Sequence, residues 1–514
     1  MLTFLKVNRF SFCFKLVILT LLFSQSGALA QGNEFVTRFG SNLILNNQPF
    51  YAIGVNCYYL QNLSAYKDTF HIEEVFQEAK QIGANVIRTW GFFDNSDSTN
   101  PAVIQYLPNR FNESGLQALD LVISKAKKYS IYLVIPLVNN WEAYGGMNQY
   151  VRWYANNFPK KNIASEKVVQ KIIKGEEGRI YHHIVEGSYT HDDFYSNPTI
   201  IQWYKNYISN LLERVNTFTN IKYKDEPNIL AWEVANEPRS SDRSGKTVTN
   251  WMKEISAFIK TIDQNHLIST GEEGLDVSST QYSDAHKYND QSWLFDGSGG
   301  ISFQQNLQIQ DIDVGSIHCY PESWHLSNSQ GIKWLQDHNR IANQLQKPLI
   351  IGEVGKIQQR EKFFHVILNE ALYSKTGGVL IWQLVYDGRP NNDGFALYYP
   401  GDSLIWKTFQ YYSDKFEKKS GQVLEIPSNC NLLPSYPNPF NTTTIIPYNL
   451  MTTAYVKLSI FNTAGQCIAN LIEDEQQAGY HLALFDGCMF GSGTYFVYLI
   501  TNLGTESSKI VLLK

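Results

Sequence analysis

The sequence has few cysteines, no excess of positive charge and, beyond its first thirty residues, no long apolar run. Its 514 residues include six cysteines, at spacings unlike those of a zinc site. The formal net charge of -5 provides no broad basic field that would attract nucleic acid. No stretch after residue 30 approaches the roughly 20 apolar residues that a membrane-crossing helix needs. We therefore expect a globular protein with no nucleic-acid partner, no transmembrane segment and a small or neutral substrate.

The first thirty residues have the pattern of a secretory signal peptide. Lys6, Arg9 and Lys15 precede the apolar stretch LVILTLLF, and the tripeptide ALA ending at Ala30 supplies a small-residue cleavage site. We therefore predict residues 1–30 as a signal peptide that is removed after Ala30, and export of the remaining chain.

Five cysteines remain after that cleavage, an odd number that leaves at least one thiol unpaired. Cys57 and Cys319 lie in apolar, strand-like runs, so we expect them to be small buried core residues. Cys467 and Cys488 are a possible pair, and the sequence leaves that question open.

Eight apolar runs recur from about residue 50 to residue 386, each followed by polar or glycine-rich residues. They are FYAIGVNCYY, NVIRTWGFF, YLVIPLVNN, ILAWEVANE, HLISTGEEG, VGSIHCY, PLIIGEVG and GVLIWQLVY. Between several of them apolar residues fall at helical spacing, as at positions 72, 75, 76, 79 and 82, with Gly83 as a stop signal. Similar patterns occupy residues 116–126 and 251–262.

Continuously apolar strands are typical of a parallel sheet that helices cover on its outside. Eight strand-helix units are the number that closes a barrel, so we predict an α/β fold with a (β/α)8 TIM barrel over residues 31–418. The alternative is an open, doubly wound sheet. Its phosphate-binding fingerprint GxGxxG is absent after the first run.

A long insertion separates the third run from the fourth. Their starts, at residues 132 and 229, lie 97 residues apart, and the insertion contains WEAYGGMNQYVRWYANNF and a predicted helix near 195–220. In a barrel such an insertion lies above the carboxyl ends of the strands, where ligands bind. His182, His183 and His191 also lie in this insertion, but they lack the spacing of a ligand set, so we predict no metal site.

The composition and the apolar pattern of the sequence change near residue 420. Three prolines in NCNLLPSYPNPFN, after KKSGQ, predict a linker over residues 419–435. The alternating runs that follow predict a small all-β sandwich over residues 436–514. These runs are TTIIPYNL, AYVKLSIFN, HLALFDG, GTYFVYLITN and SSKIVLLK.

Two carboxylates follow apolar runs that would face one barrel mouth. Glu237 and its neighbour Asn236 end the fourth run, and Glu353 ends the seventh. Paired carboxylates are what the cleavage of a glycosidic bond requires, because one protonates the leaving oxygen while the other attacks or activates water. The residues alone leave other acids near strand ends open as candidates: Asp94, Glu142, Glu272, Glu273, Glu322 and Asp387.

Seven motifs in order resemble family 5 of the glycoside hydrolases, a family of retaining (β/α)8 enzymes. They are RTWGF, NNWEAYGGMNQYVRWY, WEVANEPR, TGEEG, HCYPESW, GEVGK and WQL, and the resemblance covers about residues 33 to 415. It is closest to the endo-β-1,4-mannanases, which implies a mannan-type polysaccharide as substrate and no cofactor.

The resemblance implies roles for individual residues. Glu237 matches the general acid/base, and Glu353 matches the nucleophile. Asn236 matches the residue that binds the sugar 2-hydroxyl in the cleavage subsite. Arg88 matches an arginine beside the nucleophile, where a cation keeps a carboxylate ionised.

Further matched positions line the expected cleft. His318 and Tyr320 match the pair that orients the acid/base and hydrogen-bonds the nucleophile, and Trp382 matches the platform beneath the sugar. On the leaving-group side, Trp141 matches a family aromatic residue and Arg239 matches an arginine further out.

Other candidates come from the residues themselves. Polysaccharides stack on aromatic faces, so Trp90 and Trp324, which lie near strand ends, are candidate platforms. The alternative is that both are buried, as tryptophans mostly are. Asn139 and Asn140 are candidates for hydrogen bonds to sugar hydroxyls.

A retaining mechanism requires carboxyl groups roughly 5 to 5.5 Å apart. It also requires a raised pKa at Glu237 while Glu353 stays ionised, a difference that Arg88 would create if it lay beside Glu353 alone. The alternative functions are a β-1,4-glucanase (cellulase) of the same clan and a noncatalytic glycan-binding surface protein.

The C-terminal stretch resembles the sorting domain of the bacterial type IX secretion system. The resemblance rests on YPNPFN, IPYNL, IFNTAGQ and SGTYFVYLITN. It implies an interaction with the secretion machinery, transit of the outer membrane and then release or cell-surface attachment. The alternative is a small carbohydrate-binding sandwich.

Overall fold

The computed structural model describes residues 35–159, 184–185, 189–282, 292–420, 431–435, 437–450, 453–476, 479–502 and 504–514. The predicted signal peptide, His182, His183 and most of the predicted linker lie outside these residues. Within the described part of the chain, no helix is both long and apolar enough to span a membrane.

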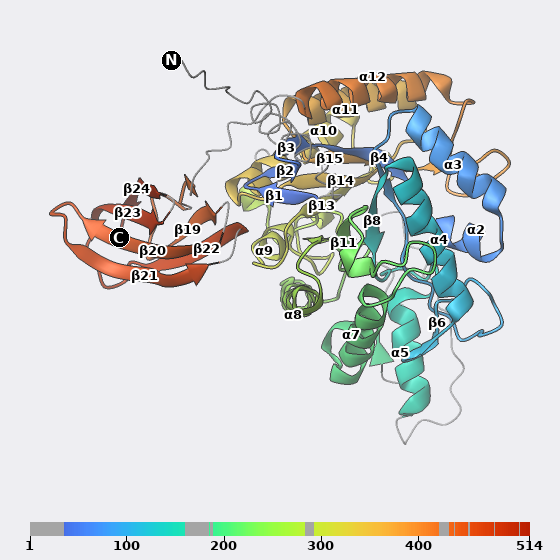
Figure 1. Ribbon diagram of the computed structural model, residues 1–514, viewed down its shortest axis with the longest axis horizontal. Helices are drawn as coiled ribbons and strands as arrows, with labels where there is room; N and C mark the ends of the chain where they lie inside the picture. Colours follow the sequence, from blue (N-terminus) through green and yellow to red (C-terminus); the bar gives the residue numbers. More distant parts are fainter. Residues whose placement is uncertain are drawn as a thin grey trace, which may run out of the picture. The chain divides into compact units, whose positions relative to one another are not determined.

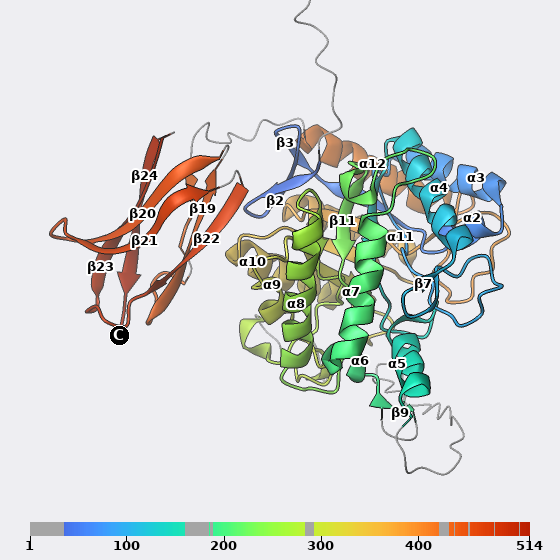
Figure 2. The same cartoon turned by 60° about the horizontal axis from the view of Figure 1, so that its bottom comes forward.

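Eight parallel strands form a closed barrel with helices outside it (Figures 1 and 2). Their order around the barrel is β12-β11-β8-β5-β4-β15-β14-β13, and a bridge between Ser269 and Val314 joins the two ends. The prediction of a TIM barrel is confirmed, because each strand lies in one of the eight apolar runs. The strands are β4 (Ala52–Asn56), β5 (Val86–Arg88), β8 (Tyr132–Pro136), β11 (Ile229–Glu233), β12 (Leu267–Ser269), β13 (Gly315–Cys319), β14 (Leu349–Val354) and β15 (Gly378–Ile381).

The helices follow the predicted apolar patterns closely. The pattern at 72–82 forms α3, and the predicted helix near 195–220 forms α7, which ends earlier, at Leu212. The helices are α2 (Leu60–Ala65), α3 (Thr69–Gln81), α4 (Glu113–Tyr129), α5 (Gly146–Asn157), α6 (Asp193–Ser196), α7 (Pro198–Leu212), α8 (Lys246–Ile262), α9 (Phe303–Leu307), α10 (Asn328–Gln344), α11 (Arg360–Tyr373) and α12 (Ser403–Ser420). Single 3-10 turns occupy Tyr223–Asp225, Ser279–Gln281 and Ser292–Leu294.

Local sequence explains where several helices begin. Asn197 accepts hydrogen bonds from the first free N–H groups of α7, and Pro198 occupies the first helical position, where its missing N–H costs nothing. Ser327 and Gln330 form a capping box at the start of α10. These caps position the helices that support the strands of the site.

Buried side chains fill the inside of the barrel, so it is a packed core and not a channel. Val86, Val134 and Leu380 belong to this inner cluster. An antiparallel three-stranded sheet, β1 (Thr37–Phe39), β2 (Asn42–Leu45) and β3 (Gln48–Phe50), adds Leu43 and Phe50 to the same cluster. Short strand pairs β6 (Gln105–Leu107) with β7 (Arg110–Phe111), β9 (Ile184–Val185) with β10 (Tyr189–Thr190), and β16 (Leu384–Val385) with β17 (Leu397–Tyr398) lie outside the barrel.

The C-terminal domain is an all-β sandwich, as predicted. One sheet has the order β18-β19-β22 and the other the order β21-β20-β23-β24, and residues of both sheets share one apolar core. The five predicted runs all form strands, whereas β21 escaped prediction because it carries polar and charged residues along half its length. The strands are β18 (Asn431–Leu432), β19 (Thr443–Leu450), β20 (Ala454–Asn462), β21 (Cys467–Gln476), β22 (Gly479–Asp486), β23 (Gly493–Thr501) and β24 (Gly504–Leu512).

The cysteines of the described residues carry free thiols. Cys57 and Cys319 are buried, as expected, and burial raises the pKa of the Cys319 thiol to about 12. Cys467 and Cys488 are exposed and do not form a disulfide with each other. The predicted domain limits at 418 and 436 stay predictions; α12 ends at Ser420 and β18 begins at Asn431.

Candidate active site

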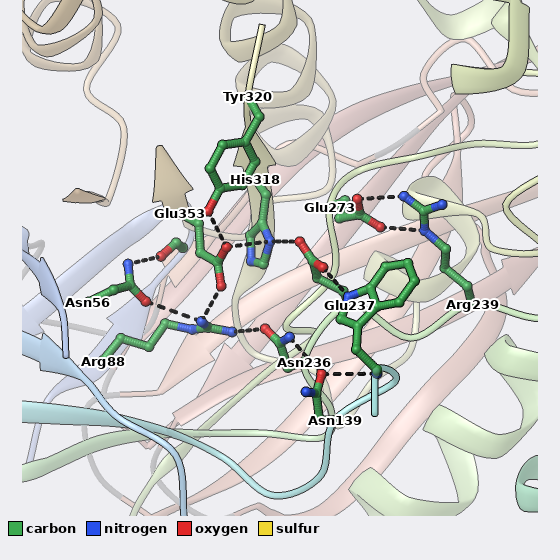
Figure 3. Close-up of polar contacts among 12 residues, drawn as sticks. Asn56, Arg88, Asn139, Asn236, Glu237, Arg239, Glu273, His318, Tyr320 and Glu353 are labelled. Carbon is green, nitrogen blue, oxygen red and sulfur yellow. Dashed lines mark hydrogen bonds and ion pairs between the residues drawn. The ribbon is translucent and has the colours of Figure 1, made fainter. Parts of the chain in front are cut away.

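Polar side chains meet at the carboxyl ends of the barrel strands, where TIM barrels carry their sites (Figure 3). Glu353 lies in β14, His318 lies in β13, and Glu237 follows β11. One ligand atom from each of these three side chains can be chosen so that all three atoms lie within 4.8 Å of one another. Two acids far apart in the sequence therefore face the same small volume, at a separation that suits a retaining mechanism.

Glu353 is buried and held by donors on both of its oxygens. Arg88 Nη1 donates to Oε1 at 2.6 Å, and the Tyr320 hydroxyl donates to Oε2 at 2.5 Å. Only 4% of Glu353 is exposed. The carboxylate is thus fixed in orientation, which a nucleophile needs in order to reach the substrate carbon.

Glu237 is held in a different way. His318 Nδ1 lies 2.6 Å from Oε1, and the Trp141 indole N–H donates to Oε2 at 2.5 Å. The backbone of Glu237 has a φ of 48°, a left-handed conformation that is uncommon for a non-glycine residue, and its N–H donates to the Gly271 carbonyl at 2.8 Å. Such strain persists where the surrounding structure enforces it, often at functional sites.

Arg88 hydrogen-bonds to two carboxylates and two amides of the site. Besides Glu353, its guanidinium donates to Glu233 at 2.8 Å, to Asn236 at 2.7 Å and to Asn56 at 3.2 Å. Arg88 is 1% exposed, so this is a buried, charge-assisted network. Sequence reasoning placed Arg88 beside the predicted nucleophile but missed Glu233, which lies inside an apolar strand.

Asn236 lies in the mouth, but its side chain is already engaged. Its oxygen accepts from Arg88, and its Nδ2 donates to Asn139 Oδ1 at 2.9 Å. Asn139 in turn accepts from the Trp141 backbone N–H at 3.2 Å. This chain of amides fixes the loop that brings Trp141 to Glu237.

The electrostatics of the acid pair differ from the expectation of a raised pKa at Glu237. Burial raises the pKa of Glu237, but the charge and hydrogen bond of His318, with Trp141 and Arg239, outweigh burial and lower it to about 2. Burial raises the pKa of Glu353, and the nearby Glu237 charge adds to this, while His318 and Arg88 offset only part of the rise.

The reason for this reversal is the position of His318. Burial lowers the pKa of His318, but the charges of Glu353 and Glu237 outweigh burial and raise it. The protonated ring lies 2.6 Å from Glu237 and 3.5 Å from Glu353, so it favours the ionised form of Glu237 more strongly. These shifts favour the ionised form of Glu237 and the protonated form of His318, whose Nδ1 lies 2.6 Å from the Glu237 carboxylate.

Aromatic rings cover the side of the mouth near β15. Trp382 is partly exposed, and its indole N–H donates to Asp393 at 2.9 Å. Tyr58 stacks against Trp382 with ring centroids 5.3 Å apart and an angle of 4°. Trp90 is only 5% exposed and packs against Tyr58 and Phe92, so it supports the platform rather than offering a face of its own.

The opposite side of the mouth is built around Arg239. Its guanidinium makes two 2.6 Å contacts with Glu273 and lies over the rings of Trp141 and Trp293, at 5.4 and 5.8 Å from their centroids. Asn140 accepts from the Arg239 backbone N–H at 3.2 Å, which gives this amide a structural partner. Sequence reasoning missed Trp293, because it lies in a 3-10 turn between β12 and β13 and not at a strand end.

Trp324 is buried, as the alternative to a sugar-binding platform predicted. It is 6% exposed and packs against Tyr320, Trp293 and Trp334. The ring therefore supports Tyr320, which holds Glu353.

The other acids that the sequence left open have separate roles in the structure. Glu142 pairs with Arg152 at 3.1 Å, and Glu322 accepts from backbone N–H groups of residues 357 and 358. Asp94 and Glu272 are buried, and burial raises the pKa of each well above its ordinary value. Neither belongs to the network around Arg88.

The cluster of Glu237, His318 and Glu353 is also the one group of potential metal ligands found among the described residues. All four carboxylate oxygens of this group already accept from protein donors, and the Arg88 cation lies 2.6 Å from one of them. A second cation there would meet electrostatic repulsion. The arrangement suits an acid pair better than a metal centre.

Residues 33–375 match the family model described as GH family 5 beta-mannosidase-like. The chain belongs to glycoside hydrolase family 5. The family resemblance that the seven motifs predicted is therefore confirmed, and the two facing carboxylates have the arrangement that this chemistry requires.

Known proteins similar to this family 5 member carry mannanase names. A tomato (Solanum lycopersicum) protein named mannan endo-1,4-beta-mannosidase 4 is 34% identical over 404 residues, covering 74% of this chain and 91% of the tomato protein. The structure of the endo-beta-1,4-mannanase from Thermotoga petrophila matches with a TM-score of 0.62 and 28% identity, covering 90% of this chain and 97% of that one. The endo-1,4-beta-mannanase from Rhizomucor miehei matches with a TM-score of 0.62 and 31% identity, covering 75% and 100%.

The C-terminal domain of this family 5 protein has its own match. Residues 435–513 fit the model of a secretion system C-terminal sorting domain. The predicted resemblance to a sorting domain is confirmed, and it indicates export of the attached barrel.

Proposed function

We propose that the barrel hydrolyses internal β-1,4-mannosidic bonds of mannans with retention of configuration. The observation that carries the proposal is the meeting of Glu237 and Glu353 in one mouth, with ligand atoms within 4.8 Å. The mannanase names of the relatives and structural neighbours support the choice of substrate.

Glu353 is the proposed nucleophile. Its carboxylate attacks the anomeric carbon and forms a covalent glycosyl ester as the bond to the leaving oxygen breaks. Tyr320 and Arg88 hold its two oxygens, so little reorganisation is needed before attack.

Glu237 is the proposed general acid and then the general base. It passes a proton to the departing oxygen, which leaves as the hydroxyl of the shortened chain. In the second step the ionised Glu237 takes a proton from water, and the resulting nucleophile cleaves the ester and frees Glu353.

The surrounding residues are proposed to bind the sugar chain. Asn236 would meet the 2-hydroxyl of the ring being cleaved, and Trp382 would lie beneath that ring. Trp141 and Arg239 would contact the leaving side. Asn140, predicted as a sugar ligand, is proposed instead to hold the Arg239 backbone.

Export is also part of the proposal. The sorting domain at residues 435–513 supports passage across an outer membrane, followed by release or surface attachment. A signal peptide over residues 1–30 would supply the earlier step across the inner membrane. The mannan chain and the secretion machinery are then the two expected partners.

Two assays test the function. Purified protein should release reducing ends from mannan, and NMR of the first products should show the β-anomer before mutarotation. Release from carboxymethylcellulose alone would overturn the mannan assignment, and an initial α-anomer would overturn retention. No turnover of any β-glycan, with binding retained, would favour the noncatalytic alternative.

Variants test the roles of the two acids. Glu353→Gln should lose turnover by at least a thousandfold, and Glu237→Ala should recover part of its lost rate when azide is added, because azide needs no general base. Glu142→Gln is the matched control, since Glu142 is a rim acid outside the network. If the control loses as much activity as Glu353→Gln, the assignment is wrong.

A further inference from the structure

A groove lies between α10 and α11, on the outside of the barrel. Its volume is about 600 Å³, within the usual range for a small-molecule site. The groove is lined chiefly by Gln336, Asn339, Asn343, Gln344, Glu370 and Tyr373.

The groove is separate from the catalytic mouth. Asn343 and Gln344 lie at the end of α10, directly before the start of β14, and Tyr373 ends α11, directly before the start of β15. Helix ends that precede a strand lie near the amino ends of the barrel strands, whereas Glu353 and Glu237 lie at the carboxyl ends. The groove therefore cannot be an extension of the catalytic cleft.

Tyr373 is the most exposed aromatic residue in the described part of the chain, at 85%. The ring stands at the wall of the groove, without the cover that helix-surface aromatics usually have. Covering a large exposed ring with another surface lowers the free energy, because apolar area is removed from water. A flat aromatic face beside a groove is a natural stacking surface.

Side-chain amides supply most of the polar atoms of the lining. Gln336, Asn339, Asn343 and Gln344 each carry both donor and acceptor atoms. Asn339 donates to the Ser374 carbonyl and Gln344 accepts from Arg340, so Gln336 and Asn343 are the amides best placed to meet a ligand. Arg340 and Glu370 also line the groove and carry opposite charges.

This chemistry selects a neutral, hydroxyl-rich ligand. Sugar hydroxyls donate and accept hydrogen bonds as side-chain amides do, and the C–H face of a sugar ring packs on an aromatic ring. An anionic ligand would meet the carboxylate of Glu370, and a wholly apolar ligand would leave the amides at the groove without partners.

We propose that this groove is a second binding site for a mannan chain, remote from catalysis. The identity of the sugar rests on the proposed function; the neutral, hydroxylated class rests on the groove itself. A polymer held at the groove raises the effective concentration of its other segments around the same enzyme. The site should therefore matter for polymeric mannan and not for short oligosaccharides.

The test compares polymer binding by full-length inactive variants that all carry Glu353→Gln. Glu353→Gln prevents turnover, and its retardation in gels containing soluble galactomannan gives a dissociation constant. Adding Tyr373→Ala should weaken that affinity at least threefold, and a second change, Gln336→Ala with Asn343→Ala, should act in the same direction. Tyr411→Ala, which removes a 54% exposed ring from α12 outside the groove, is the matched control and should leave affinity unchanged.

Activity supplies the second readout. In otherwise wild-type protein, Tyr373→Ala should lower hydrolysis of insoluble mannan about three- to tenfold, while kcat/KM for mannopentaose stays within twofold. Unchanged polymer affinity in both groove variants, with an unchanged Tm, would overturn the groove proposal. A different result is that Tyr373→Ala weakens polymer affinity while the wild-type protein does not cleave mannan. That result would overturn the proposed function but not the groove proposal.

Discussion

Replacing Arg88 with leucine removes a buried guanidinium that holds four side chains of the site together. Two of its partners, Glu233 and Glu353, are carboxylates that are 2% and 4% exposed. The other two, Asn56 and Asn236, lose hydrogen bonds of 3.2 and 2.7 Å. Leucine keeps much of the volume but leaves two buried negative charges close together without their cation.

Breaking a buried pair by removing one partner costs about 3–5 kcal/mol, because the remaining charge stays desolvated. At an unfolding entropy of about 2.1 cal/mol/K per residue, a domain of roughly 390 residues loses about 1.2 °C of Tm per kcal/mol. We therefore expect Arg88→Leu to lower the Tm of the barrel by about 4 to 6 °C at pH 7.

The loss of Tm in Arg88→Leu should increase as pH rises. Burial already raises the pKa of Glu353, and loss of the Arg88 cation raises its folded-state pKa further above the unfolded value, so the protonated form is favoured in the folded state. Stability is then fully present below the unfolded pKa of about 4.3 and is lost as pH rises. The difference in Tm between wild type and Arg88→Leu should therefore be smaller at pH 4 than at pH 7.

Calorimetric unfolding at both pH values measures this effect. Arg152→Leu is the matched control, because Arg152 pairs with Glu142 at the partly exposed rim and such pairs are worth about 1 kcal/mol or less. A Tm loss for Arg88→Leu no larger than that of the control, or a loss of equal size at both pH values, would refute the reasoning.

Three further changes probe the wall of the site and the buried acids. Tyr320→Phe removes the hydrogen bond to Glu353, worth about 1.5–3 kcal/mol for a charged partner. We expect kcat to fall about tenfold to a hundredfold and Tm to fall by about 2 to 4 °C, because a buried carboxylate oxygen loses its donor. An unchanged kcat would contradict the role of the hydroxyl. Trp293→Ala removes a ring that covers one face of Arg239, so it should raise KM for mannotetraose more than it lowers kcat. Steady-state kinetics measure both constants. A larger effect on kcat than on KM would count against a binding role. Burial raises the pKa of Asp94 well above its ordinary value, so stability from its neutral form is lost as pH rises above about 3.9. Asp94→Asn does not titrate, so its stability relative to wild type should rise as pH rises from 4 to 8, which thermal unfolding measures. A constant difference would show that Asp94 titrates normally.

The fold could be predicted from the sequence because its strands are short, buried and interrupted by clear stops. All eight apolar runs became barrel strands, and burial on both faces is what makes them continuously apolar. Elements that are half polar escaped prediction: α5 lies in the aromatic, glycine-containing insertion, and β21 carries charged residues along its exposed half.

The site was predictable only in part. Residue chemistry narrowed the acids to those near strand ends, and the family resemblance selected Glu237 and Glu353 among them. Burial could not be read from position, because Trp90 lies at a strand end like Trp141 and yet is covered by other rings. Arg239 and its partner Glu273 come from different loops, so their pairing depends on closure of the barrel.

The electrostatics of the acid pair were the least predictable feature, since they depend on a distance difference of less than 1 Å. His318 lies 2.6 Å from Glu237 and 3.5 Å from Glu353, and this asymmetry favours the ionised form of Glu237 beside a protonated ring. Both carboxylate charges stabilise the ring cation, so its proton affinity depends on Glu353 as well as on Glu237. In the proposed mechanism, the charge of Glu353 is drawn into the new bond as it attacks the sugar, and the ring cation loses that support. The proposal then has the proton pass from His318 to Glu237 across their 2.6 Å contact and on to the leaving oxygen, which would couple nucleophilic attack to acid catalysis.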